Sequence, residues 1–226
     1  MQPAEPLGSG EREAGQKGRD HRPVDPQQAA LELDRRIGQG ASAGDLQAWL
    51  DGLSHAARVA AVRGLSRRAE ASLWTRVADA GSLTLDALVP SGTPLHVPVR
   101  HYGLNSLPAF RVFEKRFYRV TPGSDAGAGI AGANFQRISP LTGPGYFVVR
   151  HAPRAGELLV DYNHIPSEAP QGWPALAAND RGRQRLVYGF MIDTLRRVSE
   201  HVSIGRAARK GVEIDAYFVL CREAPA

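Results

Sequence analysis

The segment DYNHIPSE, at residues 161–168, carries the side chains of this chain that are best suited to chemistry. Asp161 and His164 supply a carboxylate and an imidazole, Asn163 supplies an amide, and the nearby GPGY supplies the phenol of Tyr146. Such groups at the mouth of a sheet can transfer protons or orient the polar end of a ligand. We therefore expect a small-molecule ligand to bind there. The alternative is an enzyme that uses His164 or Asp161 as its general base.

A long irregular stretch, APQGWPALAANDRG at residues 169–182, follows this segment and places Trp173 between a glycine and a proline. Loops of this length often act as lids or binding elements. Trp173 is therefore expected near the entrance of the site, although it can equally serve as a plug for the core. Asp161 also has a purely structural interpretation, in which it pairs with Arg150 or caps a turn.

A hairpin must position these groups, and the segments GYFVVRH and ELLVDYNH on either side of APRAG predict one. If His151 pairs with Gly156, residues 152–155 form the connecting loop, with Pro153 suited to a type I turn. Alternation along the strands then separates an apolar core face from a mixed face. The predicted core face holds Phe147, Val149, Leu158, Val160 and Tyr162. The mixed face holds Tyr146, Val148, Arg150, Glu157, Leu159, Asp161 and Asn163.

The stretch FRVFEKRFYR, at residues 110–119, interleaves aromatic and basic residues and raises the question of a polyanion site. We expect an amphipathic helix here, capped by Asn105 or Ser106, with its aromatic side packed on the sheet and its basic side in water. The expected inward residues are Phe110, Phe113 and Phe117. Nucleic-acid or other polyanion binding remains an alternative, because a basic surface that tracks a backbone could form there. It would use Arg111, Lys115, Arg119, Arg181, Arg183 and Arg185.

Motifs for cofactors or metals either are absent from this sequence or lack the neighbouring elements that they require. GAGIAG, at residues 127–132, matches the dinucleotide-binding glycine pattern in letters, but the strand, helix and acidic residue required around it are missing, so we interpret it as a flexible loop. His96 and His101 are five residues apart and would point to opposite faces of a strand. Cys221, the single cysteine, lies in an apolar run without an activating group. We therefore expect no cofactor and no metal.

Three regions are expected along the chain. Residues 1–26 are rich in Gly, Pro, Gln and charge and predict a disordered tail. Residues 27–80 predict three or four short helices, with Ser54 and Ser66 as N-caps. Leu46, Trp49, Leu50 and Leu53 form one apolar stripe in this region.

Residues 81–226 are expected to form an α+β domain whose short Val-, Leu-, Tyr- and Phe-rich runs are strands. Apolar residues recur at threes and fours from Leu186 to Val202 and predict one long C-terminal helix. The expected fold is a mainly antiparallel sheet packed on that helix, with a helical N-terminal region; a small closed barrel is the alternative.

Composition sets the remaining limits. The 226 residues are 42% hydrophobic and 23% charged, as in a folded globular protein, and no apolar run approaches the ~20 residues needed to span a bilayer. The net charge is +5, but 25 of the 28 basic residues are arginine, a skew that codon composition alone can produce. With one cysteine and no visible signal segment, a cytoplasmic small-molecule-binding module is the leading interpretation.

Overall fold

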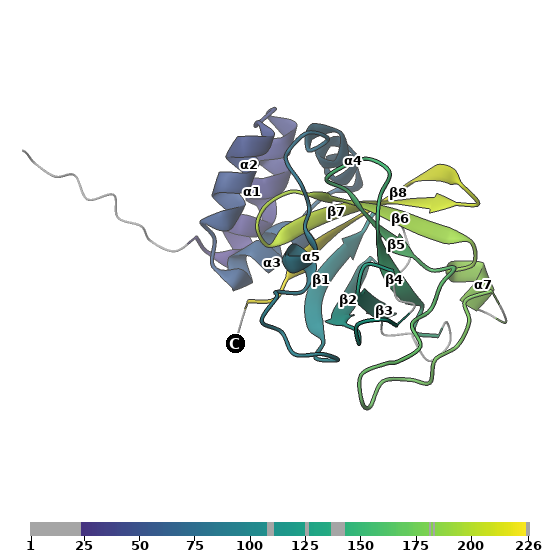
Figure 1. Cartoon of the computed structure of the whole chain (residues 1–226). Helices are drawn as coiled ribbons and strands as arrows, with labels where there is room; N and C mark the ends of the chain where they lie inside the picture. Colours follow the sequence, from purple (N-terminus) through teal and green to yellow (C-terminus); the bar gives the residue numbers. More distant parts are fainter. Residues whose placement is uncertain are drawn as a thin grey trace, which may run out of the picture.

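A computed structural model of the chain describes residues 24–107, 111–124, 127–136, 143–180, 182 and 184–224. It shows helices gathered along one side of a β-barrel, with α7 on the opposite side (Figure 1). The helices are α1 (Pro26–Gly38), α2 (Ala43–Asp51), α3 (His55–Arg63), α4 (Arg67–Arg76), α5 (Leu85–Leu88) and α7 (Gln184–Val187). The strands are β1 (Val99–Asn105), β2 (Val112–Arg119), β3 (Ile130–Phe135), β4 (Tyr146–His151), β5 (Leu158–Asp161), β6 (Met191–Arg197), β7 (Val202–Arg209) and β8 (Val212–Arg222).

The strands form a closed antiparallel barrel in chain order, from β1 to β8. Each strand pairs with the next along the chain, and β8 returns to pair with β1, where His101 lies opposite Arg222. Among the strands of the described residues, closure leaves none at an edge, so their inward-facing side chains share one interior.

The barrel interior is lined by large apolar side chains that alternate with outward ones along each strand. The buried interior cluster consists of Leu83, Leu88, Val89, Val99, Phe113, Phe117, Ile130, Phe147, Val149, Leu158, Val160, Tyr162, Tyr188, Leu195, Phe218 and Leu220. Helix α5 covers the end of the barrel at which β1 begins, because Leu88 and Val89 belong to this cluster. At the other end lie Tyr162, just after β5, and Tyr188, just after α7.

The four N-terminal helices form a layer on the outside of the barrel. The caps expected from the sequence are present, since Ser54 accepts a hydrogen bond from Ala57 N and Ser66 accepts one from Ala69 N. Their apolar stripes share one core with the outer side of the barrel, to which Ile204 of β7 contributes. The helical region and the barrel therefore bury a common surface. Their division into separate domains near residue 80 stays a prediction.

The expectation of a sheet packed on one long C-terminal helix is wrong. Residues 186–202 instead form the end of α7, strand β6 and the turn into β7. A helix cannot run through Phe190, which has a positive φ of 61°, and the β-branched residues beyond it favour a strand. The sheet closes on itself, which the sequence had left as the alternative.

The amphipathic helix expected over residues 110–119 is also wrong. Residues 112–119 form strand β2, while Phe110 lies outside the described residues. Phe113 and Phe117 point inward as expected, because a separation of four residues returns to the same face of a strand as well as of a helix. Lys115 lies between them and therefore also points inward, instead of into water.

The faces expected for the β4–β5 hairpin are confirmed, but its register is not. Val149 pairs with Val160, and His151 pairs with Leu158, so the connection is longer than predicted. The shift from the expected pairing is two residues, which preserves the side to which each side chain points. All five residues of the predicted core face lie in the barrel interior.

Candidate functional site

Lys115 is the most unusual residue of the interior, because it is 2% exposed and lies among phenylalanines. Its position follows from the alternation of β2, in which Phe113, Lys115 and Phe117 share the inward face. Lysine is almost never fully buried unless its ammonium group has partners. The surroundings of its Nζ atom therefore define a candidate site.

Polar groups from three further segments converge on this amine. Nζ of Lys115 donates hydrogen bonds to Asn134 Oδ1, at 2.9 Å, and to the hydroxyl of Tyr162. Asn134 also donates to the Tyr162 hydroxyl, at 2.9 Å. Asp193 Oδ2 lies 3.6 Å from Nζ, beyond a normal hydrogen bond, and Asp193 Oδ1 has no partner in the described part of the chain. These four residues, Lys115, Asn134, Tyr162 and Asp193, are called the Lys115 cluster below.

Aromatic rings surround the same amine. The ring centroids of Tyr162, Phe218 and Phe147 lie 4.9, 4.9 and 5.0 Å from Nζ, and that of Phe113 lies at 5.8 Å. Ring faces attract cations at these distances, most strongly where water is excluded. The rings therefore form a cage that partly replaces the hydration of the ammonium group.

Glycines make room for this cage. Phe113, Phe147 and Phe218 each lie directly opposite a glycine on the neighbouring strand, and these partners are Gly103, Gly132 and Gly205. A Cβ atom added to Gly103 would lie 2.6 Å from the Phe113 ring, and one added to Gly132 would lie 2.5 Å from the Phe147 ring. Any larger residue would displace the rings, so the cage depends on close approach of ring and backbone.

Burial shifts the proton equilibria of the Lys115 cluster toward neutral forms. The pKa of Lys115 is lowered to about 8, mainly because burial disfavours the ammonium form, and the charge of Asp193 opposes the shift. Burial likewise raises the pKa of Asp193 and holds the pKa of Tyr162 well above its usual value. The barrel thus holds an amine, a carboxyl and a phenol whose charges are all disfavoured by their surroundings.

His101 extends this polar region along β1. It lies opposite Lys115 in the β1–β2 register and is 2% exposed. Its Nε2 lies 2.9 Å from Leu88 O and must donate to that carbonyl, which leaves Nδ1 as an acceptor without a partner among the described residues. Burial lowers the pKa of His101 to about 3, so the imidazole is neutral.

A cavity of about 220 Å³ opens at the end of the barrel next to Tyr162. Its lining residues are Tyr162, Asn163, Ile165, Ala178, Asn179, Asp180 and Phe190. Asn179 is buried and bridges two strand ends by donating to Tyr146 O and Tyr162 O, at 2.6 and 2.8 Å. Its Oδ1 has no partner within the described residues. Tyr162 therefore borders the cavity and also contacts Lys115 Nζ through its hydroxyl.

The residues expected to form a site around DYNH are only partly brought together. Asp161 is buried and accepts hydrogen bonds from Asn163 and Arg150, at 2.9 and 3.1 Å, and its Oδ2 lies 2.9 Å from His164 Nδ1. These contacts lower the pKa of Asp161, although burial alone would raise it. The His164 side chain is 61% exposed. Asn163 is the member of this group that lines the cavity.

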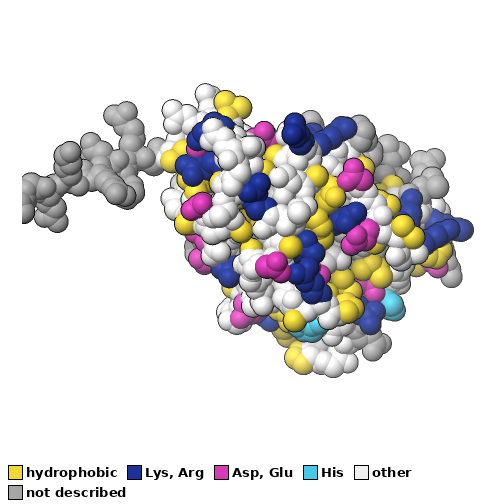
Figure 2. All heavy atoms as spheres, turned by 90° about the horizontal axis from the view of Figure 1, so that it is seen from above, with side chains coloured by type: hydrophobic (Ala, Val, Ile, Leu, Met, Phe, Trp, Pro, Cys, Tyr) yellow, Lys and Arg dark blue, Asp and Glu magenta, His cyan; other side chains and the backbone are white. Residues whose placement is uncertain are grey.

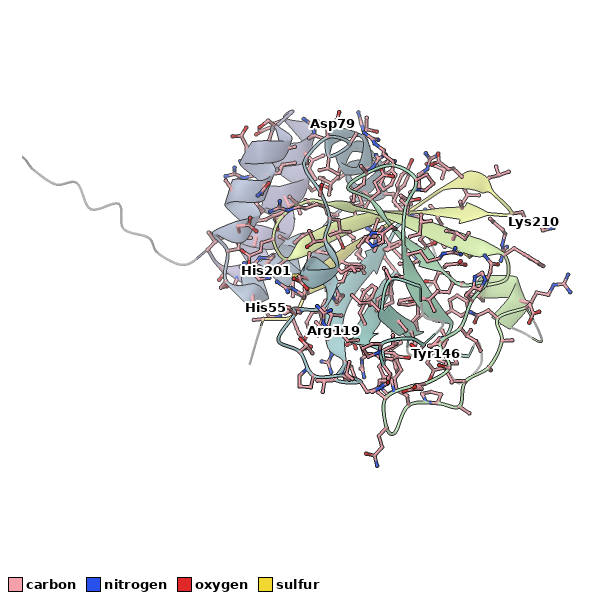
Figure 3. The ribbon with its side chains drawn as sticks, viewed as in Figure 1. His55, Asp79, Arg119, Tyr146, His201 and Lys210 are labelled. Atoms are coloured by element: carbon pink, nitrogen blue, oxygen red, sulfur yellow. The ribbon has the colours of Figure 1, made fainter. Side chains whose placement is uncertain are left out.

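Tyr146 and Trp173 lie on the outer side of the barrel. Tyr146, which is labelled in Figure 3, belongs to the face of β4 opposite Phe147. Its hydroxyl donates to Pro174 O at 2.5 Å. Trp173 packs edge-on against Tyr118 and Phe135, with centroid distances of 5.4 and 4.8 Å. The loop that carries Trp173 therefore packs on the outside of the sheet, against a small buried cluster of Tyr118, Val120, Ala131 and Val148.

The residues expected to form a basic surface do not share a face. Lys115 points into the barrel, whereas Arg111 donates to Leu65 O and Arg119 donates to Asp86 Oδ1 at 2.5 Å. Arg185 is exposed, and Arg181 and Arg183 lie outside the described residues. Figure 2 shows basic and acidic side chains interspersed on the face it presents. That pattern differs from the field of one sign that attracts polyanions.

The glycine motif GAGIAG and the cysteine Cys221 lie in ordinary structural positions. Gly127 and Gly129 of GAGIAG have positive φ in a loop, but Ile130–Gly132 already belong to β3. Cys221 is buried, and burial raises the pKa of its thiol to about 12. Within the described ranges, no group of three or more His, Cys, Asp or Glu side chains is placed to hold a metal ion.

The sequence reasoning missed Asn134 and Asp193, named Lys115 only as part of a polyanion-binding surface, and placed Tyr162 only as core. Two signals pointed to the lysine. Phe113, Lys115 and Phe117 recur every second residue, which is the period of one face of a strand. Lys115 is also one of only three lysines beside 25 arginines, so the choice of an amine at this position stands out.

Comparison with models of known protein families, with curated proteins and with solved structures found no match. No helix in the described part of the chain has both the length and the apolar character that crossing a membrane requires. The fold itself is informative, because a closed eight-stranded antiparallel barrel is typical of proteins that hold one small molecule.

Proposed function

We propose that this protein binds a small organic molecule at the barrel end marked by Tyr162, with the Lys115 cluster as the polar centre of the site. The observation that carries the proposal is the fully buried amine of Lys115 in its aromatic cage. We also propose that the protein resides in the reducing environment of the cytoplasm.

Stability alone does not account for such a cluster. Removing an ammonium and a carboxylate from water costs several kcal/mol for each ion, and apolar residues of similar volume often give a more stable core. Asp193 approaches Lys115 only to 3.6 Å and leaves one oxygen without a partner in the described structure. A buried group that costs stability and has a perturbed pKa is a reasonable candidate for function.

The cavity limits the ligand to a small molecule. A volume of about 220 Å³ lies below the range of roughly 300–1,000 Å³ that is usual for drug-sized ligands. Phe190 and Ile165 offer apolar contacts, and Asn163 offers an amide. The expected ligand therefore combines a small apolar body with one polar end directed past Tyr162 toward Lys115.

The earlier alternative, an enzyme that uses Asp161 or His164 as general base, has less support from the geometry. Arg150, Asn163 and His164 already contact the Asp161 carboxylate, and His164 is directed largely to solvent. We propose that Asp161 instead holds the turn that positions Asn163 beside the cavity.

A fragment panel with matched variants tests the proposed function. Small aromatic and aliphatic alcohols, ketones, aldehydes and acids are screened against the full chain by the shift in melting temperature. At least one class should stabilise the wild type, and Lys115→Met should lose most of that shift while retaining the circular dichroism of the barrel. Tyr146→Phe is the control, because Tyr146 lies on the outer side of β4.

Two outcomes would contradict the proposed function. One is that no class of the panel stabilises the wild type. The other is that every stabilising class acts equally on Lys115→Met, because the Lys115 cluster would then have no part in binding.

A further inference from the structure

We propose that Lys115 is a nucleophile that forms an imine with a small aldehyde or ketone held at the Tyr162 end of the barrel. This inference rests on the proposed binding function and names the chemical class of its ligand. It starts from the identity of the buried basic residue and from the groups that surround its Nζ atom.

The choice of lysine is the first step. Binding of an anion in a buried site is usually served better by arginine, whose guanidinium is always charged and binds carboxylates with two parallel hydrogen bonds. This chain uses arginine at 25 of its 28 basic positions, yet the interior position facing the cage carries lysine. Only lysine can become a neutral amine near neutral pH and attack a carbonyl carbon.

The environment favours that neutral amine. Lys115 is fully enclosed, and its nearest carboxylate oxygen, on Asp193, is too distant for a normal hydrogen bond. Desolvation in an apolar pocket is a recognised way to activate a lysine. Lowering its pKa from 10.5 to about 8 raises the fraction of neutral amine at pH 7.

The neighbouring groups can handle the protons of the reaction. The amine adds to the carbonyl carbon, a C–N bond forms, and one amine proton passes to the former carbonyl oxygen to give a carbinolamine. A second proton, from the Tyr162 hydroxyl or the protonated Asp193 carboxyl, allows that oxygen to leave as water. The nitrogen lone pair then forms the C=N bond, so the products are one iminium and one water.

The charge of the product is stabilised by the same cage as the charge of the free lysine. A protonated imine carries one positive charge on the same nitrogen, which stays within about 5 Å of the ring centroids of Phe147, Tyr162 and Phe218. The carboxylate that remains on Asp193 after proton transfer is the counter-ion for this charge. Both states are therefore supported by the same groups.

We place the route to the enclosed amine beside Tyr162. Its hydroxyl contacts Lys115 Nζ, and the same residue lines the cavity of about 220 Å³. Tyr188 stacks on Tyr162 with an interplanar angle of 17° and a centroid distance of 5.4 Å. A rotation of this pair would open the path from the cavity to the amine. Small carbonyl compounds should therefore react faster than bulky ones.

Reductive trapping with benzaldehyde tests the inference. The full-length protein is incubated with benzaldehyde and sodium cyanoborohydride, and peptide mapping measures how fast a benzyl group is added at Lys17, Lys115, Lys210 and the N-terminal amine. Lys115 should react at least ten-fold faster than Lys210, and unfolding in urea should abolish this preference. Lys115→Arg should remove the fast reaction, whereas Lys210→Arg should leave it unchanged.

Benzyl alcohol separates the two proposals, because it resembles benzaldehyde but cannot form an imine. If Lys115 reacts no faster than Lys210 while benzaldehyde and benzyl alcohol both protect the fold against heat, the imine inference is overturned and the binding function stands. If Lys115 reacts no faster and neither compound protects the fold, both proposals are contradicted for small aromatic ligands. Fast labelling of Lys115 supports both.

Discussion

Lys115 and Asp193 face each other inside the closed barrel, with 3.6 Å between Nζ and Oδ2, and both side chains are almost completely removed from solvent. The pair joins β2 to β6, strands that lie far apart in the chain and are not neighbours in the barrel. An amine and a carboxyl group therefore meet across the interior of the barrel. The functional proposals are based on this pair.

Replacing Lys115 and Asp193 by apolar residues should show how much stability the barrel loses by burying this polar pair. Lys115→Met alone and Asp193→Leu alone should each lower the free energy of unfolding, by up to about 3–5 kcal/mol, because each leaves a buried polar partner uncompensated. The double variant should be at least as stable as the wild type. Urea unfolding of the four proteins measures this cycle. A double variant whose losses simply add would show that the two residues do not interact.

The cage predicts a steric effect at Gly205. An added methyl group would meet the ring of Phe218, which lies opposite Gly205 and contacts the amine of Lys115. Gly205→Ala should therefore destabilise the barrel by about 1–3 kcal/mol, the usual cost of overpacking a core. Phe218→Leu combined with Gly205→Ala should recover part of that loss. Equal stability of Gly205→Ala and the wild type would mean that the ring is not held against the backbone.

Glu70 predicts a pH dependence of stability. It is fully buried in α4, neither carboxyl oxygen has a hydrogen-bond partner in the described part of the chain, and burial raises its pKa to about 7. A carboxyl whose folded pKa exceeds its unfolded value of 4.5 contributes most stability below pH 4.5, and that contribution is lost as the pH rises through about 7.

The comparison of wild type with Glu70→Gln isolates this effect. Between pH 4.5 and 7 the free energy of unfolding of the wild type should fall relative to that of the variant, by at most about 3 kcal/mol. Denaturant titrations at several pH values measure the difference. Parallel curves for the two proteins would contradict the raised pKa.

The strained backbone of Phe190 predicts that the shape of the cavity is kept at the expense of fold stability. It has a φ of 61°, a conformation that bulky residues rarely adopt, and its side chain lines the cavity beside Tyr162. Phe190→Gly should remove the strain and stabilise the fold by up to about 1–2 kcal/mol, while weakening any ligand that fills the cavity. Melting temperatures with and without a panel ligand measure both effects. A loss of stability in the free protein would argue against the strain.

Local signals in the sequence predicted the local structure well. Serine caps at Ser54 and Ser66 and the apolar stripes behind them were sufficient for the helical layer, because caps and stripes depend on near neighbours. The alternation along β4 and β5 likewise predicted which side chains face the core, since a register error of two residues leaves the faces unchanged.

Long-range pairing was the information that the sequence did not provide. Strand β2 was mistaken for a helix because Phe113 and Phe117 satisfy both periods and because lysine is expected to face water, as it would on the outer side of an amphipathic helix. Asn134 lies opposite Lys115 in the β2–β3 pairing, whereas closure of the barrel brings Asp193 and Tyr162 to the same amine. The candidate site was therefore invisible in any single segment, although Tyr162 had been placed in the core and Asn163 in the site.

The most direct measurement is a nuclear magnetic resonance titration of the protein labelled with ¹³C at lysine Cε. The chain has three lysines, Lys17, Lys115 and Lys210, and the Lys115→Met variant assigns the signal of interest. We predict that the Lys115 signal titrates with a pKa of about 8 and shifts when a stabilising panel ligand is added. A Lys115 signal that titrates near 10.5, the usual value for lysine, and does not respond to any ligand would contradict the account.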